Sequence, residues 1–184
     1  MFYLILQFIT DKVPQSIADA FARLYEELMP KVFRYINYRI VDVDAAQDLT
    51  ETVFEKALVK FQSYSSDKAG FSTWIFSIVR NALVDHYRVS AREMNLQKET
   101  IAQTKYEDNP RLDDEVVKAE EMKLLQSCVS QLTSQEKEVI SLKFGGEMTN
   151  RQIAKMLGIS ESNVGTIAYR TVRKLRDKFK EAIV

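Results

Sequence analysis

Small polar side chains recur along a basic segment near the C-terminus, a pattern suited to contact with nucleic acid. Ser162, Asn163 and Thr166 can hydrogen-bond to base edges that are exposed in a major groove. Basic side chains follow at helical spacing, and such groups suit backbone phosphates. The residues that we expect to contact DNA are Ser162, Asn163, Thr166, Tyr169, Arg170, Arg173 and Lys174.

The preceding residues predict the pair of helices that would position this segment, a helix-turn-helix. Thr149 and Gln152 have the spacing of a capping box, which starts a helix. Gly158 can end that helix in left-handed geometry, Ser160 can cap the second helix, and Ala154 is small where the backbones meet. Apolar side chains supply the inner faces, at Ile153, Leu157, Ile159, Val164 and Ile167.

A plain helical hairpin with a solvated basic face is the alternative interpretation of these residues. Helical hairpins are common, so the two-helix pattern alone would not distinguish the two interpretations. The charge distribution favours DNA, because residues 150–180 contain eight basic side chains and two acidic ones.

The composition favours an all-α protein. The chain has 184 residues, of which 46% are apolar, with only five Gly and three Pro. Its formal net charge is zero, yet residues 42–55 contain five acidic side chains and no basic one. An acidic segment and a basic segment in one chain suggest two different partners.

Metal, redox and membrane chemistry are poorly supported. A single cysteine, Cys128, excludes an internal disulfide and a multi-cysteine zinc site, and fits a reduced, cytoplasmic setting. His86 is the lone histidine, so we expect neither a metal nor a cofactor. The apolar start of the chain is too short to span a bilayer, and we expect it to pack on the body without inserting into a membrane; contact with a membrane surface is the alternative.

Apolar periodicity divides the chain into two small helical domains joined by a linker. In the first domain, one helical face carries Phe21, Leu24, Leu28, Val32 and Tyr35, and Pro30 is expected to kink or divide it. Asp44 is expected to cap a second helix, and a third begins near Phe71 and ends near Arg88. The predicted domains are 1–90, a flexible acidic linker at 91–118, and a helix-turn-helix domain at 119–184.

Taken together, these segments resemble the extracytoplasmic-function group of bacterial sigma-70 factors. The stretch "DAAQDLTETVFEKAL" resembles region 2.2 of that group, and "FSTWIFSIVRNALVDHYR" resembles regions 2.3 and 2.4. The stretch from "LTSQEKEVISLKF" to "RTVRKLR" resembles region 4, although many members carry a basic residue where Gly165 stands. The ordered set covers residues 17–178, and the order is more specific than any one motif.

The resemblance implies a protein that binds the β′ and β subunits of core RNA polymerase and directs them to promoter DNA. It implies that an acidic helix docks on polymerase, through Asp48, Leu49, Glu51, Phe54 and Glu55. It implies that the −10 element is read and melted through Tyr64, Ser65, Lys68, Arg80, Asn81, Asp85 and Arg88. Phe71 and Trp74 lie on the apolar stripe, so we expect them in the core. Family members are commonly held by an anti-sigma factor, which is therefore an expected partner.

Other functions fit the residues less well. A stand-alone helix-turn-helix regulator would need a sensor or dimerisation domain, and the N-terminal half suggests neither. An enzyme would need a nucleophile–base pair or a phosphate-cradling glycine loop, and none is evident. A sigma antagonist would leave the basic recognition helix unexplained.

Overall fold

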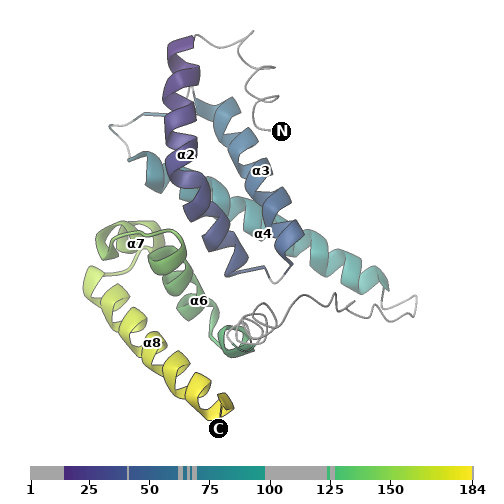
Figure 1. Cartoon of the computed structure of the whole chain (residues 1–184), viewed down its shortest axis with the longest axis vertical. Helices are drawn as coiled ribbons and strands as arrows, with labels where there is room; N and C mark the ends of the chain where they lie inside the picture. The colour runs from purple at the N-terminus through teal and green to yellow at the C-terminus, as the bar shows by residue number, and fades with distance from the viewer. Residues whose placement is uncertain are drawn as a thin grey trace, which may run out of the picture.

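The computed structural model describes residues 15–40, 42–61, 64–65, 67, 70–97, 124 and 127–183, and its regular elements there are all helical (Figure 1). Three helices form an N-terminal module, and the remaining elements form a C-terminal module. The elements are α2 (Gln15–Asn37), α3 (Val43–Lys60), α4 (Phe71–Gln97), α6 (Ser134–Ile140), the π-helical turn η2 (Ser141–Gly145), α7 (Asn150–Leu157) and α8 (Glu161–Ile183). The prediction of an all-α fold is confirmed for these residues.

The apolar face predicted for the first helix faces the core of the N-terminal module. Phe21, Leu28 and Val32 are buried there, and Leu24 is partly buried against the same cluster. Pro30 lies inside α2, which continues past it as one helix, so the predicted division does not occur. The predicted N-terminal packing segment, residues 1–14, lies outside the described residues.

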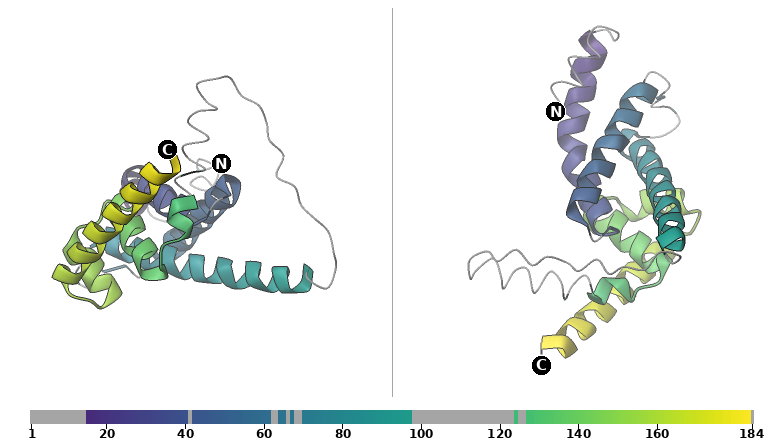
Figure 2. Two further views of the ribbon diagram at one scale, coloured as in Figure 1. Left: turned by 90° about the horizontal axis from the view of Figure 1, so that it is seen from below. Right: turned by 90° about the vertical axis from the view of Figure 1, so that its right-hand side faces the viewer.

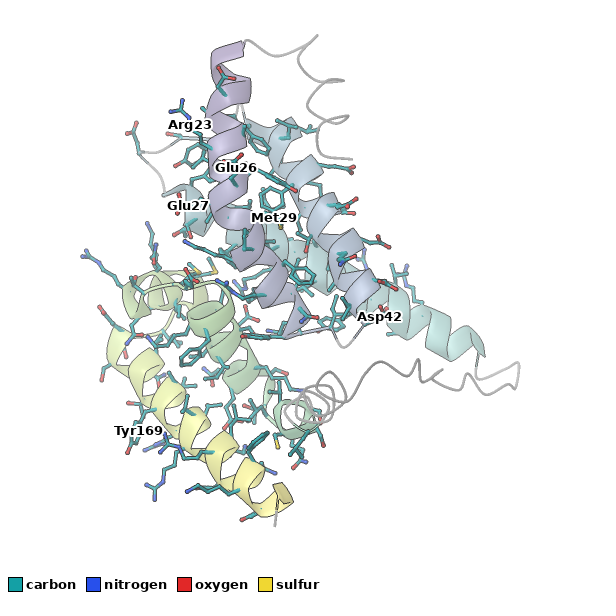
Figure 3. The ribbon with its side chains drawn as sticks, in the orientation of Figure 1. Arg23, Glu26, Glu27, Met29, Asp42 and Tyr169 are labelled. Atoms are coloured by element: carbon teal, nitrogen blue, oxygen red, sulfur yellow. The ribbon has the colours of Figure 1, made fainter. Side chains whose placement is uncertain are left out.

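The helix α3 begins earlier than the sequence suggested. Asp42, not Asp44, is the capping residue, because its carboxylate accepts hydrogen bonds from the backbone N–H groups of Asp44 (2.9 Å) and Ala45 (3.1 Å). Figure 3 labels Asp42 at the start of α3, beside the end of α2. Asp44 instead lies in the first turn of the helix, where a negative charge complements the helix dipole.

The helix α4 is longer than predicted, since it continues to Gln97 instead of ending near Arg88. No Pro or Gly interrupts residues 71–97, and good helix formers such as Arg, Glu, Leu and Gln fill the added turns. The end of α4 extends beyond the packed helices (Figure 2). Residues 91–97, which we expected to begin the linker, are therefore helical, and the rest of the predicted linker, 98–118, lies outside the described residues.

The C-terminal module is assembled from helices with well-defined starts. Thr133 and Glu136 form a capping box at the start of α6, and α6 continues directly into η2. The interior of the module is filled by buried apolar side chains, among them Val139, Leu142 and Ile153. The long helix α8 packs against α6 and α7 (Figure 1).

The two modules pack against each other through close backbone contact. The helix α2 lies against η2, and α4 contacts α7. A Cβ atom on Gly145 would lie 2.8 Å from the backbone N and Cα of Tyr35, and one on Gly146 would lie 2.8 Å from the Phe76 ring. Only glycine permits such an approach, and buried residues of both modules form one continuous apolar cluster.

We expect Gly145→Ala to disrupt this packing, because the added methyl group would overlap the Tyr35 backbone. Overpacking of this kind lowers the free energy of unfolding by about 1–3 kcal/mol, which urea denaturation followed by circular dichroism would measure. Gly165→Ala is the matched control, because its Cβ would lie 3.4 Å from the Asn150 side-chain nitrogen, an ordinary contact. That control should be neutral or stabilising by up to about 1 kcal/mol. Equal effects of the two variants would contradict the close approach.

Candidate nucleic-acid interface

The helix pair predicted from local signals is present at α7 and α8. The Thr149 hydroxyl accepts a hydrogen bond from the Gln152 backbone N–H (3.3 Å), and the Gln152 side chain accepts one from the Thr149 N–H (2.9 Å). Gly158 has a φ of 68°, and the Ser160 hydroxyl accepts a hydrogen bond from the Asn163 N–H at 3.1 Å. Each feature follows from the local chemistry of helix ends.

The inner faces of this pair are filled as predicted. Ile153 and Val164 are fully buried, Ala154 is buried at the crossing, and Leu157, Ile159 and Ile167 pack partly buried around them. This packing orients α8 so that its other face points to solvent. Close backbone contact at Gly165 is not required, as its nearest neighbour is a side-chain atom at ordinary distance.

The outer face of α8 is accessible. Tyr169 is 70% exposed and projects from the side of α8 that faces away from α6 (Figure 3). The predicted residues that are exposed on this helix are Ser162, Asn163, Thr166, Tyr169, Arg170 and Arg173. The small side chains lie in the first two turns, where a recognition helix contacts base edges.

Lys174 differs from its exposed neighbours. Its ammonium group is half-buried and pairs with the Glu136 carboxylate at 3.1 Å. The pKa of Glu136 is lowered, chiefly by the hydrogen bond from the Thr133 backbone and also by Lys174. Lys174 thus ties α8 to α6, and its charge is partly balanced within the module.

The loop before α4 carries an aromatic cluster. The Tyr64 ring centroid lies 5.2 Å from those of both Phe71 and Trp74, and stacks on Phe61 at 6.2 Å. Phe71 is buried and Trp74 partly buried, so the core packing predicted for them is confirmed. Ser65 is half-buried, whereas Lys68 lies outside the described residues.

The outer surface of α4 presents the other predicted −10 residues. Asn81, Asp85 and Arg88 are exposed, and the Arg88 guanidinium pairs with Asp85 at 3.2 Å. Arg80 is placed differently. Its Nε donates to the Glu138 carboxylate at 2.9 Å, and its Nη1 donates to the Met156 carbonyl at 3.3 Å. Arg80 is therefore occupied at the contact between the modules.

A cluster around Glu138 was not predicted. One oxygen of its carboxylate accepts hydrogen bonds from the Tyr35 hydroxyl (2.9 Å) and Arg80, and the other accepts one from Arg39. Only 14% of the Glu138 and Arg39 side chains is exposed. The donors lie far from Glu138 along the chain, so no local spacing could have revealed the cluster.

Burial and neighbouring charges shift the pKa values of Tyr35 and Arg39 in this cluster. Burial raises the pKa of Tyr35, and the nearby Glu138 charge raises it further, so the phenol remains a hydrogen-bond donor. Burial alone would lower the pKa of Arg39, but Glu138 and Tyr35 outweigh it, and the pKa is raised. Two guanidinium groups and one phenol thus direct their donors at the Glu138 carboxylate.

The acidic face predicted on α3 is partly exposed. Asp48, Glu51 and Glu55 are exposed, and Leu49 is half-buried beside them. Phe54 is only 5% exposed, and its ring packs edge-on against Tyr25 with centroids 4.6 Å apart. Phe54 therefore supports this face from the core and does not form part of its surface.

The described part of the chain lacks two further kinds of feature. It contains no group of three or more His, Cys, Asp or Glu side chains that could hold a metal ion. It also contains no helix with enough length and apolar character to cross a membrane.

Each module matches a model of a known protein family. The family model "Sigma-70 region 2" matches residues 24–93, and "Sigma-70, region 4" matches residues 122–175. Together these matches span about two thirds of the chain, in the order expected from the sequence.

Curated relatives extend the similarity over most of the chain. It is 29% identical over 168 residues to the ECF RNA polymerase sigma factor BldN of Streptomyces coelicolor, which covers 91% of this chain and 63% of that protein. It is 22% identical over 160 residues to the ECF RNA polymerase sigma factor SigM of Bacillus subtilis, covering 87% and 95% respectively. The chain thus spans slightly less than two thirds of BldN and nearly all of SigM.

A solved structure has the same fold. It is the sigma factor RpoE from Bartonella quintana in complex with the anti-sigma factor NepR, with a TM-score of 0.67 and 18% sequence identity. The match covers 88% of this chain and 97% of that one.

Proposed function

The chain belongs to the extracytoplasmic-function group of the bacterial sigma-70 family, and we propose that it brings core RNA polymerase to promoter DNA and supports initiation. Under this proposal the chain has no catalytic reaction of its own, because polymerisation belongs to the core enzyme. The protein would act in the cytoplasm, where polymerase and promoters are found.

One observation carries the proposal. The first turns of α8 are exposed and bear Ser162, Asn163 and Thr166, in a chain that contains both sigma-70 regions in order. Side chains at the start of a recognition helix reach base edges, and Arg170 and Arg173 farther along suit phosphates. We assign this face to the −35 element.

The acidic face of α3 is our candidate for polymerase binding. Asp48, Glu51 and Glu55 present carboxylates around the half-buried Leu49. An apolar contact within a charged rim suits a basic helical partner, and the family resemblance points to a coiled coil of the β′ subunit.

The aromatic loop and α4 are our candidates for the −10 element. Tyr64 could stack on an unpaired base once it leaves its aromatic neighbours, while Asn81 and Arg88 already face solvent. An anti-sigma partner is a further proposal, supported by the complex in which RpoE was solved.

A reconstituted transcription assay tests the function directly. The purified chain and core polymerase should together initiate from members of a promoter library, whereas core polymerase alone should not. A stand-alone regulator, the alternative function, would bind a palindromic site by itself and would leave core polymerase inactive on every promoter.

Base readout by α8 predicts different effects for two substitutions. Asn163→Ala should relax preference at one position of the upstream element, because it removes a side chain able to pair with a base edge. Arg173→Ala should weaken binding to all sequences alike and reduce the salt slope by about 1. Holoenzyme binding to a randomised upstream element at several salt concentrations would measure both. Uniform effects from both variants would contradict base readout.

Docking through the acidic face predicts that Asp48→Lys weakens polymerase binding. Asp48 is exposed, so reversal of its charge should leave the fold intact. The new positive charge should weaken the binding free energy to a basic partner by about 1–3 kcal/mol, which is roughly 5- to 150-fold in affinity. Glu26→Lys is the matched control, because it makes the same charge change on the exposed side of α2 (Figure 3). Titration of labelled core polymerase would separate the two. Indistinguishable affinities would remove Asp48 from the interface.

A further inference from the structure

Two guanidinium groups and one phenol converge on the Glu138 carboxylate. Tyr35 reaches it from α2, Arg39 from the turn that follows α2, and Arg80 from α4. Both carboxylate oxygens are engaged, although the donors belong to one module and the acceptor to the other. The N-terminal module therefore contains a preformed set of donors for a two-oxygen anion.

A second carboxylate extends the same charge pattern along α2. Glu147 pairs with Lys31 at 3.5 Å and with Arg34, whose Nε also approaches the Gly145 carbonyl at 3.5 Å. Glu147 has a positive φ of 53°, a backbone conformation that is uncommon for a residue with a side chain. The C-terminal module thus covers a row of cations on the N-terminal module with carboxylates.

We propose that Arg39, Arg80 and Tyr35 form a binding site for a DNA backbone phosphate, which the Glu138 carboxylate occupies while the modules are packed together. This inference rests on the proposed function, since it deepens how the N-terminal module holds promoter DNA. It makes Glu138 an internal competitor of DNA.

The chemistry of the donors supports a phosphate. A phosphodiester presents two unesterified oxygens that share a negative charge, as a carboxylate does. Guanidinium groups bind both kinds of anion, and the phenol adds a neutral donor. Arg80 is also adjacent in sequence to Asn81, an exposed residue on the proposed −10 surface, so the site would continue that surface.

The arrangement makes the two anions mutually exclusive. Tyr35 is fully buried and only 14% of the Arg39 side chain is exposed, because η2 packs on α2 and Glu138 of α6 pairs with both residues. DNA could reach these donors only after the modules separate. Separation would expose the cations and would also release Glu138 into solvent.

The test compares Glu138→Gln with Glu181→Gln in the full chain. Both substitutions remove one negative charge from the C-terminal module, but Glu181 is exposed near the end of α8. Small-angle X-ray scattering would measure module separation, and fluorescence anisotropy would measure binding to a labelled single-stranded DNA oligonucleotide. Circular dichroism would check that each variant is folded.

We expect only Glu138→Gln to open the chain and to bind DNA more tightly. One charge-assisted contact can change affinity by about tenfold. Each phosphate that the cluster gains should steepen the salt slope by about 0.7 for a single strand. Adding Arg39→Gln or Arg80→Gln to Glu138→Gln should abolish the gain in DNA affinity and the steeper salt slope.

Gly145→Ala provides an independent route to the same state. It disturbs the contact with the Tyr35 backbone without changing any charge, so it should also open the chain and tighten DNA binding. If Glu138→Gln does not fold, this variant decides the question by the same criteria.

Several results would overturn the proposal. These are an open chain with unchanged DNA affinity, equal behaviour of the Glu138 and Glu181 variants, or gains that survive loss of the arginines. Preferential binding of poly-glutamate by the opened chain would instead assign the cluster to an acidic protein. If the chain initiates transcription but does not give these DNA-binding results, only the proposed phosphate site is wrong. If it gives these results but does not support initiation, the proposed sigma function is wrong.

Discussion

The Glu138 carboxylate determines how the two modules meet. A charge with little access to water must find matched partners, because burial without them costs several kcal/mol. Tyr35 on α2, Arg39 in the turn after α2 and Arg80 on α4 satisfy it together. Such a cluster adds little net stability compared with apolar packing, but it is satisfied in only one relative placement of the helices. Together with the glycine contact at Gly145, it accounts for a specific docked arrangement of the two modules.

In this arrangement one of the two proposed DNA surfaces is exposed, whereas the other is partly paired within the protein. The first turns of α8 remain exposed, whereas Arg80 is held by Glu138 and by a backbone carbonyl. In the packed state the proposed −35 face is therefore still accessible to DNA. Packing does, however, reduce the positively charged surface that the N-terminal module presents to solvent. Part of the positive charge of the N-terminal module is paired with Glu138 and Glu147, which weakens its attraction for DNA at a distance.

Features that depend on interactions between residues close in sequence were predicted more accurately than features that depend on distant residues. The ends of α7 and the start of α8 were predictable because Thr149, Gly158 and Ser160 act within a few residues of themselves. The inward face of α2 was predictable for the same reason, since periodicity is local. The cap of α3 was misassigned by two residues because Asp42 and Asp44 are chemically equivalent, and only backbone geometry selects between them.

The candidate sites were less predictable because exposure and pairing depend on distant parts of the chain. Nothing near Phe54 indicates that Tyr25 covers its ring, and nothing near Arg80 indicates a partner on α6. Resemblance to a family assigns a role to a position, but it does not specify what that side chain contacts when the polymerase and DNA are absent. A basic side chain that serves DNA in one state needs an anionic substitute in a packed state, because an unpaired buried guanidinium would oppose packing. In this chain, Glu138 supplies that anionic partner for Arg39 and Arg80.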